Sequence, residues 1–175
     1  MKTYTPQLER RFGLKDFQAA GIWGNIGHES LGTTELREVG QPPGRGGYGW
    51  LQWTGPRARA YLNWCGAHKL DWRSDAANFG YLVEELSHEY AYVITHLKET
   101  TSMAQAVEVF EQLDERAGVV AMGSRINWGQ IAMHALDTPP GVGIAAIPEA
   151  GGVMGTIGST TPLRLDDLLP RLDLL

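Results

Sequence analysis

The sequence predicts a mainly α-helical fold of the α+β class, in which helices surround a small β-hairpin or sheet and an extended C-terminal tail follows. Apolar residues recur at intervals of three or four over most of residues 14–136, which is the period of a helix. Glycine and proline break this pattern over residues 32–53, and no period is left after residue 137. The chain has 175 residues, of which 43% are hydrophobic and 20% charged, as in a globular protein with a genuine core.

The first predicted helix covers residues 14–27 and ends near Glu29. Three glycines, Gly21, Gly24 and Gly27, fall on one of its faces. A glycine inside a helix costs roughly 1 kcal/mol relative to alanine, so three of them need a compensating reason. We expect a neighbouring helix to approach this face closely.

The glycine-rich stretch at residues 32–53 predicts a short β-hairpin or a small irregular sheet. Seven glycines and prolines between residues 40 and 49 exclude a helix. Large side chains then alternate loosely with small ones, at Tyr48, Trp50, Leu51 and Trp53.

Further helices follow, and each has a recognisable start. Proline suits the first turn of a helix, and serine or aspartate caps it by accepting hydrogen bonds from its free N–H groups. These helices are expected to begin at Gly55-Pro56, at Ser74 or Asp75 (running to Leu97), at Ser102 (running to Leu113) and near Ser124 (running to Leu136).

The C-terminal part of the chain differs in composition from the rest. Residues 138–160 are rich in small residues and proline and predict a linker, whereas residues 161–175 form a leucine-rich peptide. This peptide is too short to fold alone, yet its leucines are costly to leave in water. We expect it to dock on another protein, which leaves residues 1–137 as the globular domain.

Charge and hydropathy exclude several classes of protein. The net charge is −5 and no basic stripe occurs, which argues against a nucleic-acid partner. No run of eighteen apolar residues is present, so we expect no membrane span. Residues 1–11 lack the apolar stretch of a signal peptide.

Cysteine and histidine usage indicates neither a disulfide nor a metal site. The single cysteine, Cys65, excludes an internal disulfide, and its apolar helical context predicts a buried thiol. His88-Glu89 begins like the helix of a zinc protease, but Tyr92 stands where the second ligand would be. We therefore expect no metal and no cofactor.

Glu29 is the candidate catalytic residue. Glycoside hydrolysis needs a carboxylic acid that holds a proton beside the leaving oxygen, with a second carboxylate or a held water across the sugar. Apolar surroundings favour the protonated form of such an acid. Glu29 follows an apolar helix and precedes Tyr48, Trp50 and Trp53, so it fits this role. Taken alone, a surface glutamate near a helix end is the commoner interpretation.

Two motifs, in this order, resemble the phage tail lysozyme family. Gly24-Asn25-Ile26-Gly27-His28-Glu29-Ser30 is similar to the family's helix that ends in a Glu-Ser pair. Gly46-Gly47-Tyr48-Gly49-Trp50-Leu51-Gln52-Trp53-Thr54-Gly55 is similar to its tyrosine-glycine turn into Gln-Trp and the next helix. Phe110, Glu115-Arg116 and Arg125 further resemble its aromatic residue, its Glu-Arg-like pair and its later arginine. The likeness covers about residues 14–135.

This resemblance implies that residues 1–137 are a lysozyme-like catalytic domain, a muramidase that cleaves the glycan strands of peptidoglycan. Glu29 then corresponds to the catalytic acid. Glu38 lies nine residues later, where phage-type lysozymes place an aspartate, and is the expected second carboxylate, with Glu35 as its rival. The sequence departs from those lysozymes in this glutamate, and it lacks their water-holding threonine, whose position falls near Gly44.

Three residues are candidates for substrate binding. Gln52 matches a glutamine that the family shares with lytic transglycosylases, and its expected role is a hydrogen bond to a sugar N-acetyl group or to backbone near the acid. Tyr48 and Trp53 are candidates for stacking on sugars. A tryptophan at the end of a hairpin is, however, more often a core residue.

Other activities stay open at this point. A lytic transglycosylase needs one glutamate only, and its anhydro product is lighter by one water; a chitinase-type enzyme also follows its acid with a hydroxyl residue. A non-catalytic structural component of a phage tail is an alternative of a different class. The expected location is the virion, where residues 161–175 would bind another tail protein and residues 1–137 would act on the bacterial cell wall.

Overall fold

The computed structural model describes residues 1–42, 45–115 and 121–137, and these residues are mainly helical. The predicted linker and docking peptide lie outside the described residues. No described helix combines the length and the apolar character that crossing a membrane requires. The elements are α1 (Thr5–Phe12), α2 (Asp16–Glu29), α3 (Gly55–His68), α4 (Asp75–Ser87), α5 (Ala91–Glu99), α6 (Met103–Phe110), the π-helix η1 (Glu111–Glu115) and α7 (Met122–Asp137).

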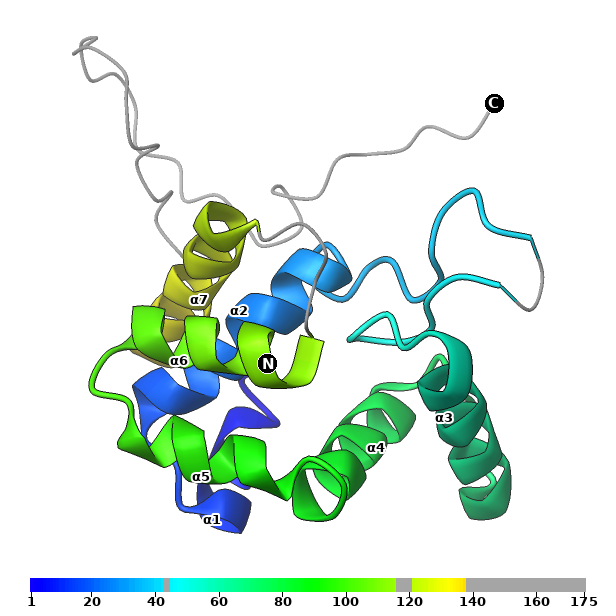
Figure 1. Cartoon of the computed structure of the whole chain (residues 1–175), viewed down its shortest axis with the longest axis horizontal. Helices are drawn as coiled ribbons and strands as arrows, with labels where there is room; N and C mark the ends of the chain where they lie inside the picture. The colour runs from blue at the N-terminus through cyan, green and yellow to red at the C-terminus, as the bar shows by residue number, and fades with distance from the viewer. Residues whose placement is uncertain (43–44, 116–120, 138–175) are drawn as a thin grey trace, which may run out of the picture.

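Helix α2 lies at the centre of the molecule. In Figure 1, α6 and α7 lie against α2 on one side, while α3 and α4 form the opposite side, and the long connection from α2 to α3 reaches outward. Residues 18–27 of α2 are all buried, as expected for a helix that is surrounded by others. The end of this central helix therefore has a fixed position, and that end carries Glu29.

The glycine face of α2 is confirmed as a site of close helix packing. A Cβ atom on Gly21 would lie 2.5 Å from the Cβ of Ala106 in α6, and one on Gly24 would lie 2.6 Å from the carbonyl oxygen of Arg125 in α7. A Cβ atom on Gly27 would lie 2.7 Å from the ring of Trp128. Neighbouring helices thus occupy the space that side chains at these positions would need.

Gly24→Ala is expected to lower the free energy of unfolding by about 1–3 kcal/mol, because the new methyl group overlaps backbone that cannot rotate away. Denaturant unfolding measures this loss. Gly66→Ala in α3 is the matched control, since a Cβ atom there meets nothing within 4 Å and should add up to about 1 kcal/mol of helix stability. Equal stability of the two variants would show that glycine does not set the spacing of α2 and α7.

Several local predictions are confirmed. The hydroxyl of Ser74 accepts a hydrogen bond from the backbone N–H of Ala77 at 3.2 Å, and that of Ser102 accepts one from Gln105 at 3.3 Å. Both serines therefore cap the helices that follow them. Cys65 is buried, as its apolar context predicts.

The single long helix expected over residues 74–97 is wrong. The chain leaves helical geometry at His88 (φ −126°, ψ −92°) and resumes as α5. The N–H groups of His88 and Tyr90 both donate to the carbonyl of Glu85, at 3.1 and 2.9 Å. This turn places the guanidinium of Arg57 4.5 Å from the centre of the Tyr90 ring. The break contains no glycine or proline, so the sequence pattern gives no sign of it.

The β-hairpin expected within residues 32–53 is not confirmed. In the described part of this connection there are two isolated antiparallel bridges, which pair Arg37 with Tyr48 and Tyr48 with Trp53, and no continuous strand. Left-handed residues such as Gly49 (φ 71°) interrupt the extended backbone that a ladder would need.

The sequence pattern predicts neither α1 nor η1. Helix α1 is only eight residues long, and its buried residues are Thr5 and Leu8, which is too few for a helical period to stand out. The helix expected to run to Leu113 is an α-helix only to Phe110 and continues as η1.

Candidate active site

A cleft of about 380 Å³ opens where α2 ends and the connection to α3 begins. It brings Glu29, Glu38 and Gln52, which were predicted to act together, into one cavity, along with the rival acid Glu35. The lining residues are Glu29, Leu31, Glu35, Arg37, Glu38, Val39, Gln52 and Thr54.

The carboxyl group of Glu29 is held by a buried arginine. Nη2 of Arg125, in α7, donates a hydrogen bond to Oε1 of Glu29 at 2.5 Å. Only 1% of the Arg125 side chain is exposed, so this pair is shielded from water on one side. A charge-assisted hydrogen bond in such surroundings fixes the direction of the carboxyl group.

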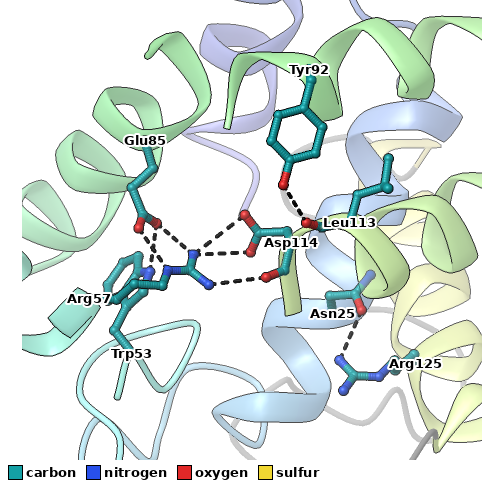
Figure 2. Close-up of polar contacts among 8 residues, drawn as sticks. All are labelled: Asn25, Trp53, Arg57, Glu85, Tyr92, Leu113, Asp114 and Arg125. Atoms are coloured by element: carbon teal, nitrogen blue, oxygen red, sulfur yellow. Dashed lines mark hydrogen bonds and ion pairs between the residues drawn. The ribbon is translucent and has the colours of Figure 1, made fainter. Parts of the chain in front are cut away.

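Asn25 holds the arginine in turn. Its Oδ1 accepts a hydrogen bond from Nη1 of Arg125 at 2.9 Å (Figure 2). Its Nδ2 donates to the carbonyl oxygens of Gly21, at 3.0 Å, and of Val107 in α6, at 3.1 Å. A chain of polar contacts thus runs from α6 through α2 to α7 and ends at Glu29. The sequence indicates apolar and aromatic surroundings for Glu29 and does not predict that the cation of Arg125 faces it.

His28 sits beside the acid without acting as a charged partner. Burial lowers the pKa of His28, and the positive charge of Arg125 lowers that pKa further, against a smaller opposite effect of Glu29. The ring is therefore neutral near pH 7, and its Nδ1 lies 3.0 Å from the hydroxyl of Ser124 in α7. Among the described residues, no group of three or more histidine, cysteine or acidic side chains is placed to hold a metal ion.

Glu38 and Glu35 differ in what their carboxyl groups contact. Oε2 of Glu38 accepts a hydrogen bond from the N–H of Gly47 at 2.8 Å, and its Oε1 accepts one from Gln41 at 3.2 Å. Glu38 thus ties the two sides of the connection together. Within the described residues the carboxyl group of Glu35 makes no hydrogen bond, although it lines the same cleft.

Gln52 supports the wall of the cleft from an unusual backbone conformation (φ 48°). Its Nε2 donates to the carbonyl oxygens of Glu35, at 2.8 Å, and of Gly49, at 3.0 Å. These bonds join Gln52 to the backbone of the cleft wall, whereas the partner expected from the sequence was backbone near Glu29 or a sugar N-acetyl group. Its Oε1 has no partner among the described residues and remains available to a ligand.

Trp53 is placed in the core rather than in the cleft. It is 1% exposed, and its ring packs against Tyr61 at 4.5 Å and Tyr81 at 5.0 Å between centroids. Its Nε1 donates to Oε2 of Glu85 at 2.7 Å. No ring face is left for a sugar, so Trp53 is a core residue, which is the more common role of a tryptophan at the end of a hairpin, as expected from the sequence.

Tyr48 is half-buried beside the cleft. The guanidinium of Arg37, which lines the cleft, lies 4.4 Å from the centre of the Tyr48 ring. The ring of Trp72 meets Tyr48 edge-on at 5.2 Å between centroids. Tyr48 therefore supports the cleft wall through Arg37 and is not itself among the lining residues.

The comparison with protein families identifies the family of this chain. The family model of phage tail lysozymes matches residues 2–136, from before α1 almost to the end of α7. The chain belongs to the phage tail lysozyme family. Among curated proteins no significant match was found. The matched region contains the whole cleft together with Asn25 and Arg125.

Some residues of the site carry little signal in the sequence of this member of the family. Asn25 lies four residues before Glu29, on the same helix face, and this spacing alone could have indicated a partner of the acid. Arg125 was marked only by the resemblance. Leu31 and Val39 belong to an irregular connection, where no period distinguishes a lining residue from any other.

A second polar network lies on the α3 and α4 side of the molecule (Figure 2). Arg57 of α3 forms two hydrogen bonds with the carboxylate of Glu85 in α4, at 2.8 and 2.9 Å, and contacts a carboxylate oxygen of Asp114 in η1 at 3.2 Å. Both acids are buried. Burial alone lowers the pKa of Arg57, but the hydrogen bond to Glu85 and the charges of Asp114 and Glu85 outweigh it and raise that pKa above its usual value. The network holds η1 in place. Because Glu85 also accepts a hydrogen bond from Trp53, the network holds the end of the connection that forms the cleft as well.

Proposed function

We propose that this protein is a muramidase of a phage tail, and that it hydrolyses the glycan strands of bacterial peptidoglycan in the Glu29 cleft. The proposal rests mainly on the carboxyl group of Glu29, which lies at the end of the central helix and is oriented by the buried Arg125. This carboxyl group is open to a cleft that contains two more carboxyl groups. Membership of the phage tail lysozyme family supports the same substrate. We also propose that residues 161–175 dock on a neighbouring virion protein.

Glu29 acts as the general acid in this proposal. Arg125 engages Oε1, so Oε2 is the oxygen that can carry the proton and give it to the leaving glycosidic oxygen. A second carboxylate activates a water on the other face of the sugar, and we assign this role to Glu38, with Glu35 as the alternative. Gln52 orients the substrate from the cleft wall, because its Oε1 is available to a sugar N–H group.

The test is digestion of purified peptidoglycan by the full chain, with the products analysed by mass spectrometry. Hydrolysis gives fragments with a reducing muramic acid end. Fragments lighter by one water identify a lytic transglycosylase instead, in which the 6-hydroxyl of the sugar replaces the attacking water. A protein that binds to tails but releases no fragments would be a structural component.

Glu38→Gln is expected to lower the cleavage rate about 10²-fold, and more than Glu35→Gln, since an amide cannot activate a water. The amide oxygen can still accept the hydrogen bond of Gly47, so the thermal stability should change little. Initial rates on peptidoglycan and melting curves measure the two effects. Glu99→Gln, at the exposed end of α5, is the control. A larger loss in Glu35→Gln would move the role to Glu35.

A further inference from the structure

Two exposed hydrophobic side chains line the Glu29 cleft. Leu31 is 59% and Val39 77% exposed, and they are two of the three large hydrophobic residues exposed in the described part of the chain. We propose that Leu31, supported by Val39, recognises the acetamido group of an N-acetylhexosamine glycan. The inference rests on the proposed function for the identity of the polymer, but it concerns binding and not the chemical step.

The backbone of Leu31 is strained. Its φ is 46°, a left-handed conformation that is unfavourable for a residue with a branched side chain. In the described residues, positive φ occurs at four non-glycine positions: Leu31, Thr33, Gln52 and Lys69. Leu31 and Gln52 both line the cleft. Strain of this kind persists only where surrounding contacts enforce it, and it gathers at binding and catalytic sites.

The turn that carries Leu31 is fixed on both of its flanks. The hydroxyl of Ser30 donates to the carbonyl of Ile26 at 2.7 Å and accepts a hydrogen bond from the N–H of Thr33 at 2.9 Å. The N–H of Gly32 donates to the carbonyl of Gly27 at 2.9 Å. These contacts tie the turn to the end of α2, so the fold itself presents the leucine to the cleft.

The chemistry of the cleft wall fits an acetamido group. Nε2 of Gln52 is used by two backbone carbonyls, which leaves Oε1 as an acceptor for the N–H of that group. The methyl group of the acetamido group would then lie against Leu31 and Val39, where it shields apolar surface from water. A glucose unit, which carries a hydroxyl at this position, offers neither the methyl group nor the N–H.

Leu31→Asn in the full chain tests this recognition. Asparagine tolerates left-handed backbone, so the melting temperature should be equal to or higher than that of the wild type. The affinity for tri-N-acetylchitotriose, measured by calorimetry, should fall about fivefold, somewhat less than the roughly tenfold effect of one methylene group in a closed pocket. Weak binding of cellotriose should not change, and Leu31→Met should restore the affinity.

Lys69→Asn is the matched control. Lys69 also has a positive φ, 56°, but it ends α3 and does not line the cleft, so its replacement should raise stability and leave affinity unchanged. Unchanged trisaccharide affinity in Leu31→Asn, or an equal loss for cellotriose, would overturn the inference. Binding that depends on Leu31 in a protein that does not cleave walls would support the inference and overturn the proposed function.

Discussion

Glu29→Gln is expected to lower the rate of peptidoglycan cleavage by about 10²- to 10⁴-fold, because glutamine cannot give a proton to the leaving oxygen. The amide oxygen can still accept the hydrogen bond from Arg125. Whenever Glu29 is ionised, its carboxylate is the counter-charge of the buried Arg125, which an amide cannot provide, so we also expect a loss of about 1–3 kcal/mol in the free energy of unfolding. Product release from purified walls and denaturant unfolding measure the two effects.

Glu99→Gln serves as the control for this experiment too, since it makes the same change at an exposed position outside the cleft. Near wild-type cleavage by the folded Glu29→Gln variant would contradict the catalytic assignment. The assay is run below the melting temperature of the variant, so that a loss of folding is not mistaken for a loss of catalysis.

Arg57→Met is expected to cost about 3–5 kcal/mol of stability, the largest effect on folding that we predict. Glu85 and Asp114 are buried, and this change takes away the guanidinium that offsets the cost of burying them. Helix α4 and η1 would lose this polar link to α3. The free energy of unfolding measures the loss.

Arg59→Met is the matched control for the network, because Arg59 is an exposed arginine two residues away in α3. Its replacement should change stability by no more than about 0.5 kcal/mol. If Arg57→Met cost no more than this, the network in Figure 2 would not be a source of stability.

The features that were predicted correctly from the sequence depend on the spacing of residues that are close together in the chain. The glycine face of α2, the serine caps at Ser74 and Ser102, and the buried Cys65 all follow from a few neighbouring residues, and the structure confirms them. The family, too, was indicated by two short motifs and is confirmed over residues 2–136. Each of the structural features, and each motif by itself, lies within a short continuous segment of the sequence.

Features that depend on distant contacts could not be predicted. The helix break at His88 belongs to a turn that places Tyr90 against Arg57, more than thirty residues earlier in the chain. The cation beside Glu29 comes from α7 and is separated from it by 96 positions. The connection has two isolated bridges in place of a hairpin because left-handed residues such as Gly49 interrupt its extended backbone.

Under the proposed function, the late position of Arg125 in the chain determines when the Glu29 site becomes complete. Glu29 is synthesised 96 residues before Arg125, and Asn25 is synthesised 100 residues before it. A nascent chain that has emerged only as far as α6 has its acid but not the guanidinium that orients it. Under the proposed function, the site is therefore expected to be complete only when α7 has left the ribosome and packs on α2.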